Sequence, residues 1–464
     1  HETLPVSVVI RTKDRPALLA EAIASVRATG YPCEIVVVND GGARPDIEGL
    51  TLVDVAEIRY TSYETTGCVL NPIRLEAFVA IPRGVATPMP GLVVAHGLGG
   101  WAESGSASTP AAQLGVVALA YSGPGGGGSE GTGSEPDHLF DTSVDPRNSW
   151  FWEHAVAAMR GLTALGLYAE VDASRLAMTG YSGGSVATWM VAGIDDRLAA
   201  AFPVSATGYL DLAIGATPNP GWEADLLGAM TPPRTSVAVE WTNYERWLDP
   251  KLFLATLHAP VMLVNGAQDE FFPVTSTLAT MGDARAAQPA SRLLLVPNWD
   301  HGWYAYFTGD EATELANGAI EMWMGNKLGT DEGYADDPPM PQIDSVAAWT
   351  CYDPTYWWIT WSCSAVVASV PDHAGYDVDG ATFWFSVDNA LTFTSWNLQE
   401  YSDGVWWAEV GTLDAALYTS ANTVWFVDFE LSAGILDPHF HVTTLPNVPA
   451  GFSPYILPTD GPLP

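Results

Sequence analysis

The sequence is poor in basic residues. Its 18 lysines and arginines stand against 54 aspartates and glutamates, which gives a formal net charge of −36 at pH 7. A surface with this balance repels nucleic acid, anionic lipid and polyanionic substrates, so we expect no nucleic-acid partner. The chain also lacks any apolar run of about 18 residues, so we expect no membrane span.

Cysteine is scarce as well, with only four in 464 residues. No Cys-x-x-Cys pair or Cys/His cluster has zinc spacing, so we expect no metal site. Cys351 and Cys363 flank an aromatic segment. They could form a local disulfide or remain as two buried thiols. A disulfide would suit an exported protein, and the chain starts at His1, as after removal of a leader or trimming. We therefore expect a secreted or periplasmic location.

Two blocks of the chain show alternating strand and helix patterns. In residues 1–52, apolar runs at 6–10 and 34–38 flank a helix-like stretch at 16–29, which predicts a β-α-β unit. Residues 53–328 alternate β-rich runs with helix-like stretches, which is typical of a mainly parallel, doubly wound sheet. The eight strands expected there lie at 57–63, 73–81, 91–95, 117–121, 175–179, 200–204, 260–265 and 292–296.

The last block differs in composition. It follows a linker at 329–344 that is rich in proline, glycine and aspartate, and its residues 345–464 hold 9 of the 19 tryptophans. Its short runs alternate with period two, which predicts an antiparallel β-sandwich. The tryptophans of this block would either be exposed and stack on carbohydrate, or be buried in the core of the sandwich. We expect this domain to support the preceding one by packing or by partner binding, and to carry no catalytic residue.

The segment Gly180-Tyr181-Ser182-Gly183-Gly184 lies between a strand-like run and a helix-like run. This is the context that the G-x-S-x-G nucleophile elbow requires. The glycines permit a tight turn and close approach of neighbouring backbone. The motif alone also fits an ordinary glycine-rich turn. Ser182 is the candidate nucleophile.

A serine nucleophile needs a base, and the base needs a group to orient it. His301 lies just past the strand expected at 292–296, and Asp269 just past the strand expected at 260–265. Residues at the carboxyl ends of parallel strands meet in one crevice. We therefore expect Ser182, Asp269 and His301 to form a catalytic triad, with Glu270 as the alternative acid.

The oxyanion of acyl transfer needs hydrogen-bond donors. One should be the backbone N–H of Gly183, directly after the nucleophile. The other should come from the loop after the strand at 91–95, which reads His96-Gly97-Leu98-Gly99-Gly100. We choose Leu98 as that donor, and a plain glycine turn is the alternative for this loop.

The motifs "HGLGG", "RLAMTGYSGGSVATWMVAG", "PVMLVNGAQDEFFP" and "NWDHG" together resemble the α/β-hydrolase superfamily across the 53–328 block. Within it they are similar to the acetyl xylan esterase, dienelactone hydrolase and prolyl-oligopeptidase-like branch. The resemblance implies an α/β-hydrolase fold with an eight-stranded, mainly parallel sheet. Dienelactone hydrolases carry cysteine where this chain has Ser182, and the loop Ser122-Gly123-Pro124-Gly125 departs from the xylan esterase pattern. The substrate class therefore does not transfer.

The N-terminal block resembles the opening of a family 2 glycosyltransferase, through "SVVIRTKDRPALLAEAIASV" and "EIVVVNDGG". In that family the acid at the end of the second strand helps to hold the nucleotide, and Asp40 would be that residue. The match ends near Gly42. We expect a truncated segment that binds no nucleotide sugar.

These features predict a serine hydrolase that cleaves carboxylic esters, of small molecules or polymers, without a cofactor. The stretch 207–250 falls where this fold places its cap and should shape the pocket. The alternatives are a prolyl-oligopeptidase-like serine peptidase and a non-catalytic binding protein with a hydrolase-like core. Neither the natural ester nor the oligomeric state follows from the sequence.

Overall fold

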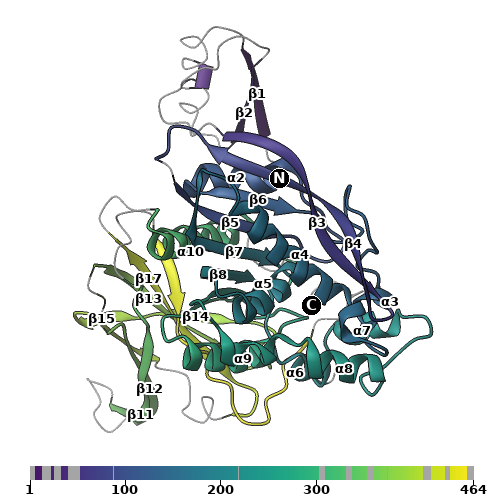
Figure 1. The fold of residues 1–464 in the computed structure, drawn as a ribbon. Coiled ribbons are helices and arrows are strands. Elements are labelled where there is room, and N and C mark those ends of the chain that lie inside the picture. Colours follow the sequence, from purple (N-terminus) through teal and green to yellow (C-terminus); the bar gives the residue numbers. More distant parts are fainter. Residues whose placement is uncertain are drawn as a thin grey trace.

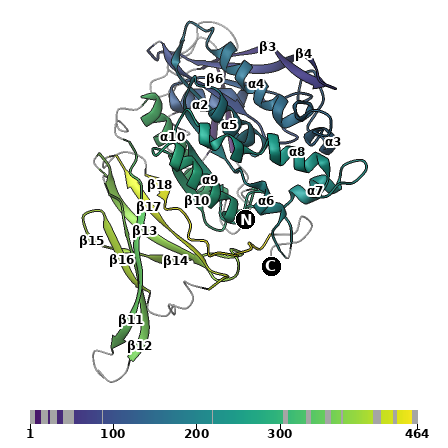
Figure 2. The same ribbon diagram turned by 60° about the horizontal axis from the view of Figure 1, so that its bottom comes forward.

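The computed structural model describes most of the chain. The described residues are 6–12, 22–23, 25, 33–39, 53–86, 88–217, 219–302, 309–330, 337–352, 360–371, 373, 375–410, 420–433 and 439–456. A large sheet with helices on both faces lies beside two smaller antiparallel sheets (Figure 1 and Figure 2). Within the described ranges, no helix has the length and apolar character needed to cross a membrane.

The large sheet has eight strands in the order β10-β9-β8-β7-β5-β6-β4-β3. β4 pairs antiparallel with β3 and β6, and the other neighbours are parallel. This topology is the α/β-hydrolase fold that the sequence predicts, and each expected strand overlaps an observed one. The strands are β3 (Val53–Thr66), β4 (Val69–Pro82), β5 (Met89–Ala95), β6 (Val117–Tyr121), β7 (Val171–Tyr181), β8 (Leu198–Val204), β9 (Met262–Gly266) and β10 (Arg292–Val296).

Two hydrophobic cores lie on opposite faces of this sheet. Side chains alternate between faces along a strand, so Leu293 and Leu295 of β10 enter one core and Leu294 and Val296 the other. Because both faces are covered, the inner strands β6 and β8 are built from apolar and aromatic residues and carry no charge. The first core is completed by α4 (Trp150–Leu165), α5 (Gly183–Ile194) and α9 (Val274–Ala287), and the second by α2 (Ser104–Leu114) and α10 (Gly309–Leu328).

Short helices fill the connection between β8 and β9, where the sequence predicts a cap. Tyr244 anchors α8 because its buried ring packs edge-on against Phe140, with 5.5 Å between ring centroids. The cap helices are α6 (Leu210–Ile214), α7 (Glu223–Gly228) and α8 (Val239–Trp247). The remaining short elements are α3 (Pro136–Leu139), η1 (Pro146–Asn148), η2 (Pro250–Leu252) and η3 (Leu254–Thr256).

The C-terminal block forms two four-stranded antiparallel sheets, in the orders β11-β12-β16-β15 and β14-β13-β17-β18. The two sheets support the expected β-sandwich (Figure 2). Phe383 and Phe429 illustrate its core, because both are fully buried on neighbouring strands. The strands are β11 (Gln342–Tyr352), β12 (Thr360–Ser369), β13 (Asp377–Ser386), β14 (Thr394–Asn397), β15 (Gln399–Ser402), β16 (Val405–Val410), β17 (Val424–Ser432) and β18 (Phe440–Thr443).

The sandwich is attached to the hydrolase sheet by polar contacts. The Thr443 hydroxyl accepts a hydrogen bond from the Leu295 N–H (3.0 Å) and donates one to the Leu293 carbonyl (3.2 Å). The Asn298 amide group donates to the Phe393 carbonyl (3.0 Å) and accepts from the Phe393 N–H (2.8 Å). These contacts join β18 and the loop before β14 to β10 and the loop that follows it.

Near the N-terminus, β1 (Val6–Thr12) and β2 (Cys33–Asn39) pair in parallel, as a β-α-β unit requires. Asp40 lies outside the described residues, so its expected role stays a prediction. The side chains of Cys351 and Cys363 are also outside the described part, and the disulfide prediction is not tested there. Cys68 is an exposed free thiol.

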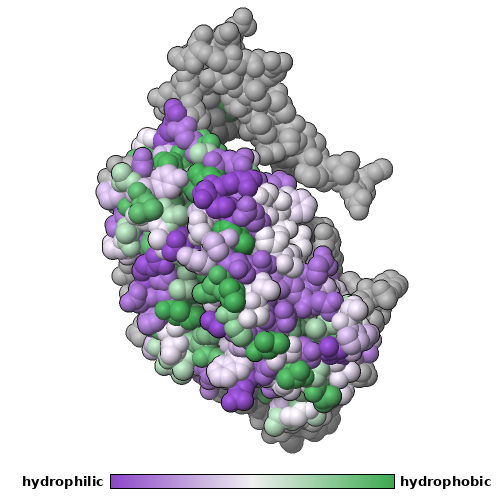
Figure 3. All heavy atoms as spheres, turned by 45° about the vertical axis from the view of Figure 1, so that its right-hand side comes forward, coloured by the Kyte–Doolittle hydropathy of each residue, from purple (hydrophilic) through white to green (hydrophobic). Residues whose placement is uncertain are grey.

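On the face shown in Figure 3, apolar residues occur in small groups separated by polar ones. Isolated apolar side chains are normal on a folded surface. Among the described residues on this face, the apolar side chains therefore form no single broad patch.

Candidate active site

Ser182 occupies a sharp turn between β7 and α5. Its backbone has φ 53° and ψ −118°, a conformation that a serine adopts only when the surroundings impose it. The flanking glycines make the turn possible: a Cβ on Gly180 would lie 2.3 Å from the Gly184 carbonyl oxygen, and one on Gly184 would lie 2.4 Å from the Ala95 oxygen. The strand–turn–helix context expected from the sequence is therefore present.

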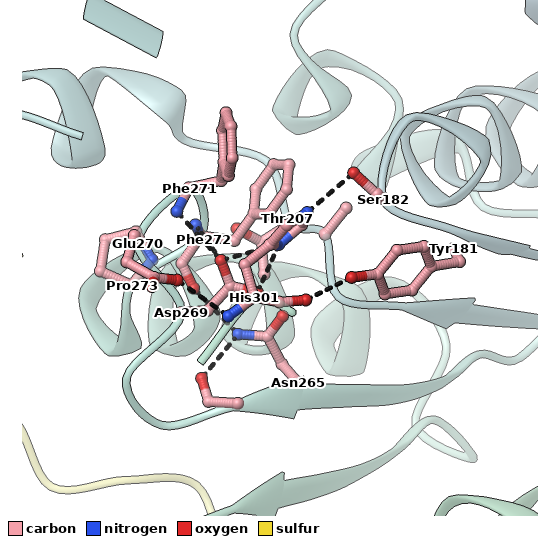
Figure 4. Close-up of polar contacts among 12 residues, drawn as sticks. Tyr181, Ser182, Thr207, Asn265, Asp269, Glu270, Phe271, Phe272, Pro273 and His301 are labelled. Carbon is pink, nitrogen blue, oxygen red and sulfur yellow. Dashed lines mark hydrogen bonds and ion pairs between the residues drawn. The ribbon is translucent and has the colours of Figure 1, made fainter. Parts of the chain in front are cut away.

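His301 and Asp269 lie beside Ser182 (Figure 4). The Nε2 atom of His301 is 2.8 Å from the Ser182 hydroxyl oxygen. Its Nδ1 atom is 3.1 and 3.0 Å from the two carboxylate oxygens of Asp269. The three residues follow β7, β9 and β10, so the carboxyl ends of these parallel strands bring them together.

Asp269 and Glu270 have different contacts with His301. One oxygen of Asp269 also accepts the N–H groups of Phe271 (3.0 Å) and Phe272 (2.9 Å), which fixes the carboxylate toward the ring. Glu270 instead accepts the backbone N–H of His301 at 2.8 Å. Of the two acids, only Asp269 has a hydrogen bond to the imidazole among the described residues.

The surroundings of His301 set its pKa. Burial lowers it, but the charge of Asp269, the hydrogen bond that the ring donates to Asp269 and the charges of Glu270 and Asp300 together raise the pKa above its usual value. Burial, followed by the charge of Asp269, raises the pKa of Glu270 to about 7. The ring therefore lies in a negative environment that stabilises an imidazolium.

The two expected oxyanion donors lie next to each other. A Cβ on Gly183 would lie only 3.2 Å from the backbone nitrogen of Leu98, so the two loops meet directly beside Ser182. The next N–H groups in the Leu98 loop are already used: Gly99 donates to the Ser134 hydroxyl (2.9 Å) and Gly100 to the Gly97 carbonyl (3.1 Å). This leaves Leu98 as the donor-bearing residue nearest Gly183 in this loop.

His96 fixes the Leu98 loop, a role that sequence reasoning missed. Its Nε2 accepts the Gly123 N–H at 2.7 Å, so its Nδ1 carries the proton and donates to the Gly97 carbonyl at 2.7 Å. Burial lowers the pKa of His96, which favours this neutral form. His154 is fully buried and stacks on Trp150 with 4.2 Å between ring centroids.

A pocket opens beside Ser182 and Gly183. Its walls are mostly apolar and come from α4, α5, the cap and the Asp269 loop; they include Leu98, Phe140, Phe151, Val186, Leu210, Leu226, Phe271 and Phe272. Two polar residues also line it, Glu223 and Tyr244. No sequence pattern points to these two residues, because they belong to short cap helices without a regular period.

One group of side chains elsewhere could hold a metal ion. Ligand atoms of Glu64, His138 and Glu153 lie within 4.8 Å of one another. An ion pair accounts for part of this group, since His138 Nε2 is 3.1 Å from a Glu153 oxygen. The Thr65 and Thr132 N–H groups, each 2.8 Å from a carboxylate oxygen of the group, occupy further acceptors.

Comparisons with known proteins show similarity in fold. No protein-family model matches this chain, and no curated protein does. Among solved structures, an acetyl xylan esterase from Paenibacillus sp. R4 is 17% identical, covers 66% of this chain and 94% of its own, and has a TM-score of 0.45. Pyrococcus horikoshii acylaminoacyl peptidase is 15% identical over 61% of this chain and 43% of its own, with a TM-score of 0.47. Est1E from Butyrivibrio proteoclasticus, with ferulic acid bound, is 18% identical over 57% and 99%, with a TM-score of 0.42.

Proposed function

We propose that the protein is a serine hydrolase that cleaves carboxylic esters through an acyl-enzyme intermediate. The observation that carries this proposal is the continuous hydrogen-bonded series from Ser182 through His301 to Asp269. A serine hydroxyl becomes a useful nucleophile when a base at hydrogen-bond distance takes its proton. The pocket beside Ser182 supplies the space for a substrate.

In the proposed reaction, His301 Nε2 takes the proton as the Ser182 oxygen attacks the ester carbonyl. Asp269 holds the ring with Nδ1–H toward its carboxylate and stabilises the imidazolium that forms. The N–H groups of Gly183 and Leu98 stabilise the tetrahedral oxyanion. His301 then protonates the leaving alkoxide, and water repeats the sequence on the acyl-enzyme. No cofactor is needed for any of these steps.

The strained backbone of Ser182 supports the same proposal. Positive φ at a non-glycine residue costs on the order of 1–3 kcal/mol and persists where surrounding structure enforces it. Here the strain directs the hydroxyl away from the sheet and toward His301. A turn with only a structural role would need neither this conformation nor a histidine placed in line with it.

The test is hydrolysis of a panel of short p-nitrophenyl esters, acetylated sugars and aminoacyl anilides by the wild type and by Ser182→Ala. We expect the substitution to lower kcat for a simple ester by about 10³-fold or more. Ser185→Ala is the matched control, because this buried serine lies three residues away on α5 and its hydroxyl is not in the series.

The proposal fails if Ser182→Ala retains activity within about tenfold of wild type. Preference for the anilides over the esters would instead favour the peptidase alternative. A folded wild type that is inactive on the whole panel would favour a binding protein. Circular dichroism of each variant shows whether its fold is intact.

A further inference from the structure

Glu223 is a buried carboxyl group in an apolar pocket. It is the first residue of α7, is 3% exposed, and lines the pocket together with Ser182. Neither of its carboxyl oxygens is hydrogen-bonded to another residue in the described part of the chain. Buried polar groups are nearly always paired, and one left unpaired is expensive. Such a group at a pocket wall points to a ligand that supplies the partner.

The local backbone makes room for this carboxyl group. A Cβ on Gly221 would lie 2.5 Å from a Glu223 oxygen, so the residue at that position must be glycine or the carboxyl group must move. The absence of a side chain at Gly221 thus lets the Glu223 carboxyl group lie in the pocket wall. Tyr244 also lines the pocket, and its hydroxyl is likewise buried and has no hydrogen-bond partner among the described residues.

We propose that Glu223 and Tyr244 bind an ammonium group of the substrate, so that the protein selects esters that carry a primary amine. This inference rests on the proposed ester hydrolysis, and it names the substrate class of that site. Glu223 is here a specificity-determining residue with no part in the bond-breaking steps.

The charges around the pocket favour a cation over a neutral polar group. Burial raises the pKa of Glu223 well above its usual value; the residue's own backbone N–H lowers it in part, and the charges of Asp269 and Asp249 raise it again. Among the described residues that line the pocket there is no lysine, arginine or histidine. The potential in the pocket is therefore negative, and an ammonium group would both neutralise it and restore the ionised form of Glu223.

The aromatic walls suit the same ligand. Tyr244 packs against Phe140 and Phe151, with ring centroids 5.5 and 5.3 Å apart, and all three line the pocket. The faces of such rings attract cations, most strongly where water is excluded. The net charge of −36 also favours the approach of cationic over anionic substrates.

Binding is tested first, without catalysis. In the Ser182→Ala background, ligand-observed NMR titrations compare n-butylammonium with 1-butanol, which has the same number of heavy atoms and no charge. We expect n-butylammonium to bind at least about tenfold more tightly, since a hydrogen bond to a charged group contributes more than one between neutral groups. Glu223→Gln should bring the two ligands within about threefold of each other, and Tyr244→Phe should weaken only n-butylammonium.

Asp225→Asn is the matched control for this titration. Asp225 lies on the same helix and is exposed, so this variant removes one negative charge without touching the pocket wall. It should keep the preference for n-butylammonium. The inference is overturned if the protein with Glu223 binds the two ligands equally well. It is also overturned if Glu223→Gln keeps the preference for n-butylammonium. Either result would assign the Glu223 carboxyl to a neutral ligand or to water.

Catalysis is tested with 2-naphthyl esters in matched pairs: glycyl and propionyl, β-alanyl and butyryl, 4-aminobutyryl and pentanoyl. Each pair exchanges an ammonium for a methyl group at increasing distance from the carbonyl. At one chain length, kcat/KM for the amine should exceed that for its partner by about 10- to 100-fold, and Glu223→Gln should remove the difference. If wild type cleaves all three neutral partners at least as well, this inference fails while the proposed hydrolysis stands. If no ester is cleaved, the proposed function fails, and the titration still decides the amine site.

Discussion

Asn298→Ala tests whether the sandwich holds the His301 loop in place. Asn298 lies three residues before His301 in a left-handed conformation, with φ 55°. Its side chain forms two hydrogen bonds with the backbone of Phe393, which is 6% exposed. Nearby, the Gln268 side chain, next to Asp269, donates to the Leu391 carbonyl. The same sandwich loop therefore contacts both loops that carry the base and the acid.

The magnitude follows from these contacts. The alanine leaves the N–H and C=O of Phe393 without their partner, at about 1 kcal/mol each, the lower end of the cost of an unpaired buried group. Alanine in the left-handed conformation adds about 1 kcal/mol. These costs add to about 3 kcal/mol. If all of this free energy holds the His301 loop in the position that catalysis needs, kcat/KM falls by about 10²-fold.

Asn298→Gly separates the two contributions, because glycine loses the same hydrogen bonds without the conformational cost. We expect a loss of about 2 kcal/mol, or about 30-fold in kcat/KM, for this variant. The assay is steady-state hydrolysis of a neutral ester, with urea denaturation of both proteins. If Asn298→Ala loses stability but keeps full kcat/KM, the contact is only structural, and the positioning argument is wrong.

Three further substitutions, with one control, test other contacts. Asp269→Asn should lower kcat by about 10³- to 10⁴-fold by disturbing the orientation of His301, whereas Glu270→Gln should stay within about tenfold; the reverse result would exchange their roles. Protonated His301 cannot act as a base, so kcat/KM falls as the pH drops through its pKa. Glu270→Gln removes one charge that raises this pKa, so the acid limb of the pH profile should move to lower pH, and an upward shift would contradict this. Thr443→Val leaves the Leu295 N–H and Leu293 carbonyl unpaired and should cost about 2–4 kcal/mol in denaturant unfolding, against less than about 0.5 kcal/mol for the exposed Thr394→Val.

The positions of Ser182, Asp269 and His301 could be predicted because each carries a local signal. Ser182 has glycines between a strand and a helix, and the other two lie a few residues past apolar runs of strand length. The geometry of a parallel sheet then brings the ends of these strands together. Their catalytic roles, like the oxyanion donors, stay predictions until they are measured.

Other features depend on contacts that no local pattern records. The pairing of Asn298 with Phe393 joins two loops from different blocks of the chain, and neither sequence is unusual for a loop. In the sequence, Glu223 does not differ from any other acid in the first turn of a short helix. Acids are common there because the helix dipole stabilises negative charge at the N-terminus. Only the burial of both oxygens shows that it differs.

The position of Thr443 affects whether β10 can associate with other molecules of this protein. β10 is the last strand on its side of the large sheet, and its sequence, Arg292–Val296, is almost wholly apolar. An open strand of this kind can pair with a strand of another molecule and start aggregation. The Thr443 hydroxyl occupies the Leu295 N–H and the Leu293 carbonyl, two groups that such pairing would use. The opposite border is β3, whose first half is mostly exposed and carries charge at Glu57 and Arg59, so the sheet is closed to growth by the C-terminal sheets on one side and by charge on the other.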